Sequence, residues 1–212
     1  FNDHDHATRV LEGEIGQNLL DNLAEKTPVR GLSFTYSGGY RIVGSNDPIQ
    51  NLDDLKKMEV TSVPSTSTFF RELAAESKTR DSQTQEEIID SLKKGNAIET
   101  TYLRFKGNNI LKTNHSMFMT TILIGNKLFD SLSEEQQNVF RRAAKKVAKL
   151  EREWSVADAE KYEQDANEKG ITITEVSKQE RTRMLEACVS AYRAARNRFP
   201  GSLELVWKIK NS

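Results

Sequence analysis

Cysteine is nearly absent from this chain. Its 212 residues include a single cysteine, Cys188. One thiol cannot build a disulfide framework or a cysteine-based zinc cluster within the chain. Cys188 lies in the helical pattern RMLEACVSAYRAA, and we expect it to be a small buried hydrophobe. One cysteine does not decide the cellular compartment.

The chain has no excess of positive or negative charge, and it has no long apolar run. Lys+Arg and Asp+Glu both number 31, so the formal net charge is zero. This balance lacks the positive footprint of a protein that binds nucleic acid. The mean hydropathy is −0.65, and the longest apolar runs, such as Ile122–Ile124, are far short of the roughly 20 residues of a membrane span. We expect neither a nucleic-acid partner nor a transmembrane helix.

The first residues carry no targeting signal. FNDHDHATRVLEGEIG lacks an initiator methionine, a charged n-region and an apolar h-region. It runs directly into a helical pattern, as expected of a segment cut from a longer protein. His4-Asp5-His6 has the spacing of a metal-binding pair, but such a pair near a terminus is usually solvated or caps a helix. We therefore expect no metal site and no cofactor.

The familiar catalytic signatures are absent as well. The sequence contains no GxSxG, P-loop, GxGxxG, HExxH or CxxC motif. His115 is the one histidine away from the N-terminus, and the favoured interpretation is a structural ring that bonds to backbone. The rival interpretation is a catalytic pair, such as His115 with Glu99, that the fold would have to assemble. We expect a binding protein rather than an enzyme.

The most distinctive stretch that is present runs from Ser133 to Gly170 without proline or an internal glycine. Ser133 and Gln136 match a capping box, and Gly170 suits the left-handed residue that ends a helix. Some 37 residues at 1.5 Å each extend roughly 55 Å. Because the seam lacks a sustained heptad of large residues, we predict a strut shared by two globules over 133–169 rather than a coiled coil. The apolar stripe predicts that Leu150 and Trp154 are buried at its middle.

Strands and helices alternate over residues 58–124, which predicts an α/β sheet with crossovers. Before this region, residues 4–26 read as a helix, and residues 32–36 and 40–43 read as strands. Ser37-Gly38-Gly39 between them is either a hairpin turn or part of a strand that crosses between domains. The other expected elements are a strand at 58–63, helices at 65–77 and 83–94, strands at 97–103, 117–124 and 171–176, and helices at 178–198 and 203–209. Along the helix at 178–198 we expect Met184, Leu185, Cys188, Val189 and Tyr192 to point inward.

Several short motifs occur in an order that resembles a known family. They are GQNLL at 16–20, GYR at 39–41, IQNLDDLK at 49–56, the helix at 86–95, TNH at 113–115 and LFDSLSEEQQ at 128–137. Together with the long helix that follows, they resemble the DctP-type solute-binding subunit of tripartite ATP-independent periplasmic (TRAP) transporters. The resemblance covers essentially the whole chain.

The resemblance implies an α/β fold of the periplasmic binding protein kind, a two-domain clamshell with a strut helix. Residues 1–38 and 126–150 would be the remnant of domain I, whose N-terminal portion is missing. Residues 39–125 and 170–212 would form domain II, and residues 133–169 would form the helix that spans both. An incomplete domain would leave a sheet edge and an apolar face uncovered, so we expect self-association there or cover by missing residues.

The resemblance also points to four solute-contacting residues, Arg41, Thr61, Thr101 and Tyr102. Arg41 stands in the family's GxR position; the alternative is a surface arginine on a strand. Thr61 stands where the family carries a signature arginine that pairs with a carboxylate. Tyr102 falls where members carry an aromatic or amide over the ligand; its alternative is an ordinary strand tyrosine.

The implied function is capture of a small organic acid or related polar solute in the periplasm, for delivery to the membrane subunits of a TRAP transporter. Because Thr61 replaces the arginine, we expect a simple dicarboxylate to bind weakly, and a monoacid or a more neutral polar molecule to be preferred. The alternative is a ligand-sensing domain of a signalling receptor with the same fold.

Overall fold

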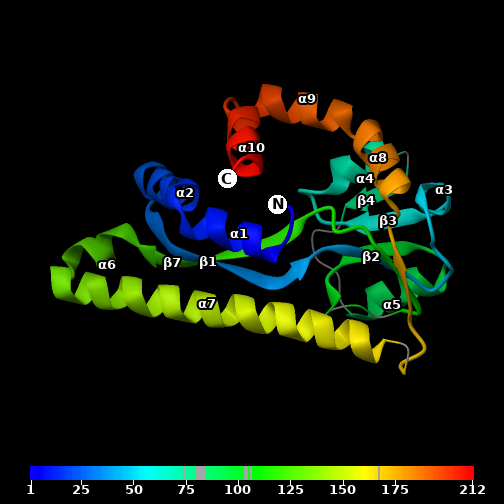
Figure 1. The fold of residues 1–212 in the computed structure, drawn as a ribbon, viewed down its shortest axis with the longest axis horizontal. Coiled ribbons are helices and arrows are strands. Elements are labelled where there is room, and N and C mark those ends of the chain that lie inside the picture. Colours follow the sequence, from blue (N-terminus) through cyan, green and yellow to red (C-terminus); the bar gives the residue numbers. More distant parts are fainter. Residues whose placement is uncertain (74, 80–84, 103–104, 106, 167) are drawn as a thin grey trace. The chain divides into compact units, whose positions relative to one another are not determined.

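The computed structural model describes residues 1–73, 75–79, 85–102, 105, 107–166 and 168–212. They divide into two compact units (Figure 1). Unit 1 contains residues 1–39, 119–157 and 201–212, and unit 2 contains residues 40–118 and 158–200. Residues 201–212, which were predicted to be part of domain II, belong to unit 1. Among the described residues, no helix combines the length and apolar character needed to cross a bilayer.

Unit 1 is built mainly of helices around a two-stranded sheet, β1–β7. Its elements are α1 (His4–Glu12), α2 (Glu14–Lys26), β1 (Val29–Tyr40), β7 (Met117–Gly125), α6 (Asn126–Ser131), the first part of α7 (Glu134–Asp165) and α10 (Ser202–Lys210). The single helix predicted over residues 4–26 is in fact two helices. They separate at Gly13, whose backbone is extended at φ −86° and ψ −168°.

The Ser37-Gly38-Gly39 segment is not a hairpin turn. β1 continues through it and pairs with β7 rather than with β2 (Ile42–Ser45). All three residues have positive φ values, 46°, 100° and 73°, a region that glycine adopts without steric cost. The chain enters unit 2 directly after Gly39. The interpretation as a crossing strand is therefore confirmed.

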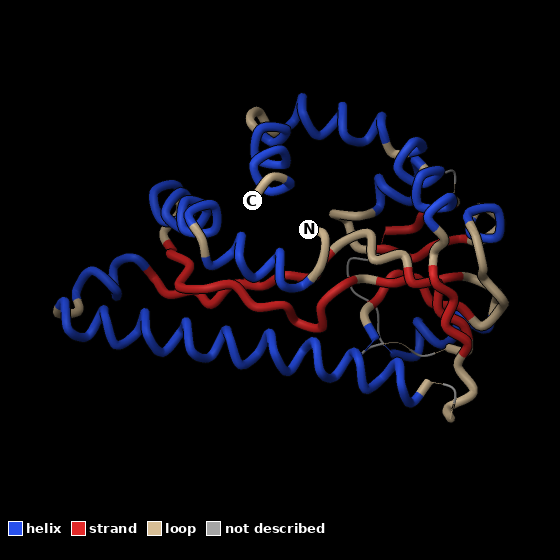
Figure 2. The backbone as a smooth tube through the Cα atoms, viewed as in Figure 1, coloured by secondary structure: helices blue, strands red, loops and turns tan. Residues whose placement is uncertain are grey.

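The long helix is confirmed as α7, a continuous helix of 32 residues. Its capping box forms as predicted: the Ser133 N–H donates to Gln136 Oε1 at 2.9 Å, and the Gln136 N–H donates to Ser133 Oγ at 3.3 Å. Gly170 has a φ of 68°. The helix contributes residues 134–157 to unit 1 and residues 158–165 to unit 2, and Figure 2 traces it without interruption.

The predicted burial of Leu150 and Trp154 is wrong. Leu150 is 36% exposed and Trp154 66% exposed. The buried face of α7 consists instead of small and polar residues, namely Ala144, Ala148, Arg152 and Ser155.

This polar face is buried because it meets the backbone of β1. Arg152 Nη1 donates to the Phe34 carbonyl at 2.7 Å, and the Glu151 carboxylate accepts the N–H groups of Tyr36 at 2.8 Å and Ser37 at 3.0 Å. Backbone groups next to left-handed residues need partners that large apolar side chains cannot supply.

Unit 2 is a six-stranded sheet with the strand order β4-β3-β5-β2-β6-β8. β2 is antiparallel to both of its neighbours, and the other pairs are parallel. The remaining strands are β3 (Glu59–Ser62), β4 (Glu76–Thr79), β5 (Ala97–Thr100), β6 (Asn109–Lys112) and β8 (Thr172–Glu175). The helices are α3 (Leu52–Leu55), α4 (Ser67–Glu72), α5 (Gln85–Lys93), α8 (Lys178–Ala187) and α9 (Val189–Arg198).

Each face of this sheet carries an apolar cluster. One contains Val43, Val60 and Leu111 together with Phe70 of α4, Met184 of α8 and Cys188. The other contains Ile42, Tyr102, Phe105, Ile110, Ala166 and Ile171, with Tyr162 of α7 packed against it. Neighbouring residues of one strand, such as Ile42 and Val43, therefore belong to clusters on opposite faces, as the two-residue period of a strand requires.

Further differences from the predictions concern unit 2. The helix predicted over 65–77 is shorter, α4 ending at Glu72, and residues 76–77 belong to β4. β6 was not predicted. The helix expected over 178–198 divides at Cys188 into α8 and α9, and Leu185, Val189 and Tyr192 are exposed rather than inward. Met184 and Cys188 are buried as predicted. The predicted residues 74, 83–84, 103 and 167 lie outside the described part of the chain.

Candidate functional site

Polar residues gather at one edge of the unit 2 sheet. The parallel strands β3, β5 and β6 end at this edge, and β2 begins there because it runs antiparallel to β5 and β6. Thr61, Glu99, Thr101 and His115 lie at or just after the strand ends, and Arg41 lies directly before β2. In open α/β sheets, ligands bind beyond the carboxyl ends of the strands.

Glu99 is the centre of one polar group at this edge. Its side chain is fully buried, and it accepts hydrogen bonds from the Thr66 hydroxyl at 2.5 Å and from the Val63 N–H at 3.0 Å. His115 Nε2 lies 3.2 Å and Arg41 Nε lies 3.5 Å from Oε1 of Glu99. Below, Glu99, Arg41, Val63, Thr66 and His115 are called the Glu99 network.

The hydrogen bonds of the network decide the charge of Glu99. Burial alone would raise its pKa, because a carboxylate loses hydration inside a protein. Donation from His115, Thr66 and Val63 outweighs that effect and holds the pKa of Glu99 below its ordinary value. Glu99 is therefore ionised at neutral pH, and it ties the loop before α4 to the end of β6.

The His115 ring contacts the side chains of Thr113, Glu99 and Phe69. Its Nδ1 lies 2.7 Å from the Thr113 hydroxyl, and its ring stacks on Phe69 with centroids 4.7 Å apart. The expectation that the ring bonds to backbone is wrong, because Thr113 and Glu99 contact it through their side chains. A hydroxyl, an imidazole and a carboxylate in this order resemble a nucleophile–base pair, and Thr113 is buried at 1% exposure.

Arg41 is buried against Glu99 and an aromatic ring. The Arg41 side chain is 9% exposed, and its guanidinium carbon lies 4.4 Å from the centre of the Phe118 ring. The Arg41 N–H donates to the Ser116 carbonyl at 2.7 Å. The alternative of a surface strand arginine is wrong for this reason.

Thr61 and Thr101 differ from the network in their hydrogen bonding. Both are buried, at 1% and 2% exposure, and neither hydroxyl has a hydrogen-bond partner among the described residues. A buried hydroxyl without a partner costs about 1–3 kcal/mol, so both positions favour an added donor or acceptor. Thr61 pairs with Ile98 of β5, and Thr101 directly follows β5.

Tyr102 belongs to the apolar cluster that includes Ile42, and its ring lies 5.7 Å from that of Tyr162. No described residue meets its hydroxyl at hydrogen-bonding geometry. Burial, and next the nearby Glu163 carboxylate, raise the pKa of Tyr102. The hydroxyl is therefore neutral and can donate.

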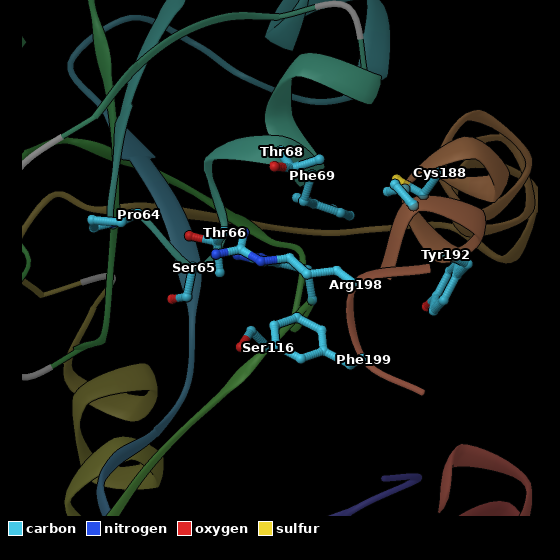
Figure 3. A pocket seen from close by; sticks show the side chains of 13 residues that line it. Pro64, Ser65, Thr66, Thr68, Phe69, Ser116, Cys188, Tyr192, Arg198 and Phe199 are labelled. Carbon is cyan, nitrogen blue, oxygen red and sulfur yellow. The ribbon is translucent and has the colours of Figure 1, made fainter. Parts of the chain in front are cut away.

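A cavity of about 680 Å³ adjoins the Glu99 network on the side of α4 (Figure 3). Its walls combine polar and apolar side chains. They are made by Pro64, Ser65, Thr66, Thr68, Phe69, His115, Ser116, Cys188, Ala191, Tyr192, Ala194, Arg198 and Phe199. Figure 3 shows the Arg198 side chain extending toward Ser65 and Thr66. Of the four predicted contact residues, none lines this cavity.

Sequence reasoning missed Thr66, Ser116 and Arg198. The position of Thr66 near a helix start is visible in the sequence. Its hydrogen bond to Glu99 is not, because the two residues are 33 positions apart. Cys188 also lines the cavity, where burial raises the pKa of its thiol to about 11. The thiol is therefore protonated and a poor nucleophile at neutral pH.

Neither the N-terminal histidines nor another described cluster forms a metal site. Asp3 caps α1 by accepting the His6 N–H at 2.7 Å. Both ring nitrogens of His6 have partners, since Nδ1 accepts the Asn2 N–H at 3.0 Å and Nε2 lies 2.7 Å from the Ile209 carbonyl. His6 therefore joins α1 to α10 within unit 1.

Comparison with known proteins gives one consistent result. A family described as "Bacterial extracellular solute-binding protein, family 7" matches residues 1–198. A solute-binding protein from Sulfitobacter sp. is 28% identical over 198 residues, which cover 88% of this chain and 58% of that protein. The chain thus spans less than two thirds of the length of this curated relative.

Solved structures show the same fold. A TRAP periplasmic solute-binding protein from Haemophilus influenzae with bound L-gulonate aligns with a TM-score of 0.86 at 20% identity, over 100% of this chain and 71% of that one. One from Xanthobacter autotrophicus with bound β-D-galacturonate aligns with a TM-score of 0.85 at 23% identity, over 100% of this chain and 72% of that one. The predicted α/β fold with a long helix is confirmed.

Proposed function

The chain belongs to the bacterial extracellular solute-binding protein family 7, and from that premise we propose that it captures a small hydroxylated organic acid for a TRAP transporter. The family is extracytoplasmic by description, and we place this protein in the periplasm. Its delivery partners would be the membrane subunits of the transporter.

One observation carries the proposal: two buried hydroxyls at the ligand-binding edge of the sheet have no described partner. Thr61 lies in β3, and Thr101 directly follows the neighbouring strand β5. Their unmet hydrogen bonds favour a polar molecule, because pairing such a group recovers the cost of its burial. A solute with several hydroxyl groups supplies donors and acceptors for both.

Arg41 is the proposed partner of the solute's carboxylate. It approaches Glu99 through Nε at 3.5 Å, which is long for a strong hydrogen bond. The fork of its two terminal nitrogens suits a carboxylate. Tyr102 is the fourth proposed contact, with a neutral hydroxyl that can donate to the solute.

The pairing of one arginine with two threonines favours a monoacid. Thr61 offers a neutral hydroxyl, whereas a second arginine would offer two charge-assisted bonds, each about 1.5–3 kcal/mol. The two aligned structures hold L-gulonate and β-D-galacturonate, which are hydroxylated monoacids. We propose the same solute class here, and weak binding of C4-dicarboxylates.

Binding rather than catalysis is the proposed role of the site. Within the Glu99 network, the Glu99 carboxylate accepts hydrogen bonds from the Thr66 hydroxyl and the Val63 N–H. A ligand-sensing domain of a signalling receptor gains no support, because the aligned structures are described as TRAP solute-binding proteins. Delivery to membrane subunits is therefore the favoured interpretation.

Calorimetric titration of the complete protein tests the proposal. D-galacturonate and L-gulonate should bind, and succinate should bind at least about tenfold more weakly, a difference of 1.4 kcal/mol. Micromolar or tighter succinate binding that survives Arg41→Lys would contradict the proposed solute class. Absence of binding by any sugar acid or organic acid would contradict the proposed function.

A further inference from the structure

Asn114 follows the end of β6 with its backbone in the left-handed region. Its φ is 44°, and among the described residues other than glycine only Ser37 also has a positive φ. Asparagine tolerates this region better than most residues that carry a Cβ, and glycine adopts it freely. Backbone conformations of this kind cluster at functional sites, where the surrounding structure holds them in place.

The neighbours of Asn114 hold the chain in this conformation. Arg181 Nη2 of α8 donates to the Thr113 carbonyl at 3.1 Å. The Thr113 hydroxyl and His115 Nδ1 lie 2.7 Å apart, so the side chains before and after Asn114 contact each other. The turn is therefore secured by residues 113 and 115, and no described hydrogen bond from the Asn114 side chain is needed to maintain it.

The amide of Asn114 is the unsatisfied group of this segment. Its Oδ1 is buried, and no described residue donates a hydrogen bond to it. A buried polar atom without a partner is unfavourable, and in native proteins such atoms usually meet a bound molecule or another polar group. Because an amide oxygen can only accept, the group that satisfies it must be an O–H or N–H donor.

The sheet places Asn114 close to Arg41 and Thr101. Continued past Ile42, the pairing registers of β2 put Arg41 next to Thr101 on one side and next to Thr113 on the other. Asn114 directly follows Thr113 at this carboxyl edge. Neighbouring strands are about 4.8 Å apart, and a six-carbon acid is longer than that spacing. An acid whose carboxylate lies at Arg41 can therefore present a hydroxyl group to residue 114.

We propose that Asn114 is a fifth solute contact, whose Oδ1 accepts a hydrogen bond from a hydroxyl group of the bound acid. This inference rests on the proposed function and adds a specificity-determining residue to it. Arg41 would recognise the carboxylate, whereas Asn114 would select acids that carry an O–H donor nearby. An acid without that donor leaves the amide unpaired, and a site built for a hydrogen bond rejects such a molecule strongly.

Two substitutions separate the side chain of Asn114 from its backbone. Asn114→Gly and Asn114→Ala both remove the amide, and each should weaken calorimetric binding of D-galacturonate to the complete protein about tenfold or more, a difference of 1.4 kcal/mol. Only Asn114→Ala should also lower the urea midpoint of unfolding, because alanine is strained at a φ of 44° and glycine is not.

Asn109→Ala is the matched control at the start of β6. Asn109 Nδ2 donates to the Asn46 carbonyl at 2.7 Å. Its substitution should therefore lower the urea midpoint and leave the affinity for D-galacturonate unchanged, the opposite pattern to Asn114→Gly.

Deoxy derivatives of D-galacturonate, each lacking a single hydroxyl group, test the hydrogen bond itself. The native protein should bind one of these derivatives about tenfold more weakly than D-galacturonate. Asn114→Gly should bind that derivative as well as the native protein does, because the lost hydroxyl and the lost amide are partners in one hydrogen bond. The remaining derivatives should still distinguish the two proteins.

Three results would overturn this inference and leave the proposed function standing. Native affinity in Asn114→Gly, with a loss only in Asn114→Ala, would show that residue 114 acts through its backbone. A urea midpoint lowered equally by both substitutions would show that the amide bonds to another part of the chain. An equal loss of affinity for every deoxy derivative would show that no solute hydroxyl pairs with the amide. A native protein that binds no sugar acid would contradict the proposed function, and this inference with it.

Discussion

Thr66 and Thr61 lie at the same edge of the unit 2 sheet and are both buried, at 9% and 1% exposure, but only Thr66 has a described hydrogen-bond partner. The Thr66 hydroxyl donates to Glu99 at 2.5 Å, and the Thr61 hydroxyl has no partner among the described residues. The comparison separates two uses of buried polarity. A satisfied network fixes the structure of the edge, and an unsatisfied hydroxyl leaves a place for a ligand.

Removing Glu99 should produce the largest effect. Glu99→Ala leaves His115, Thr66 and the Val63 N–H without their shared acceptor, and breaking a buried pair costs about 3–5 kcal/mol. Urea unfolding followed by far-UV circular dichroism measures the loss. Trp154 and Trp207, the chain's two tryptophans, both lie in unit 1, so tryptophan fluorescence would not report on this edge.

Glu99→Gln provides a variant that retains the shape of the side chain. It should lose less stability than Glu99→Ala and still fold. Hydrogen exchange at Val63 should then be faster than in the native chain. An unchanged Val63 exchange rate would contradict the role of Glu99 as its acceptor.

Thr66→Val should have the next largest effect. Its hydroxyl bonds to a charged acceptor, and such bonds contribute about 1.5–3 kcal/mol. The free energy of unfolding should fall by that amount in the same urea experiment. A loss below about 0.5 kcal/mol, within the range of surface substitutions, would mean that Thr66 does not support Glu99.

Acid should remove the contribution of the Glu99 network. Because the folded-state pKa of Glu99 lies below its ordinary value of 4.5, its ionised form stabilises the fold above pH 4.5. That contribution is lost as the pH falls through the folded-state pKa. The stability difference between the native chain and Glu99→Gln should therefore shrink below pH 4.5. A difference that stays constant from pH 7 to pH 3 would exclude this linkage.

Thr61→Val should have the smallest effect on stability, and of opposite sign. Valine keeps the shape of threonine and removes a hydroxyl whose burial without a partner is costly. Unfolding free energy should be unchanged or rise by up to about 1 kcal/mol. A loss of the size found for Thr66→Val would show that Thr61 has a structural partner and would erase the contrast between the two threonines.

Local sequence patterns predicted the elements that depend on local chemistry. The capping box of Ser133 and Gln136, the left-handed Gly170 and the proline-free run between them specify α7 without help from the rest of the fold. The same is true of β8, whose sequence alternation is clear. The order of short motifs then indicated the family.

Partners that are distant in sequence could not be predicted in this way. The buried face of α7 depends on the backbone of β1, more than 100 positions earlier, so its apolar stripe pointed to the wrong face. His115 bonds to Glu99 because β5 and β6 both flank β2, a pairing that no local pattern reveals. Whether the four predicted solute contacts act together stays a prediction.

The affinity of the complete protein for a sugar acid, compared among Thr61→Val, Thr101→Val and Thr174→Val, tests the central claim most directly. Thr174 lies on β8, away from the carboxyl ends of β3 and β5, and serves as the matched strand threonine. The account predicts that the first two variants lose about tenfold or more in calorimetric affinity for D-galacturonate, about 1.4 kcal/mol, while Thr174→Val binds normally. Native affinity in both Thr61→Val and Thr101→Val would contradict the claim that the unpartnered hydroxyls contact the solute.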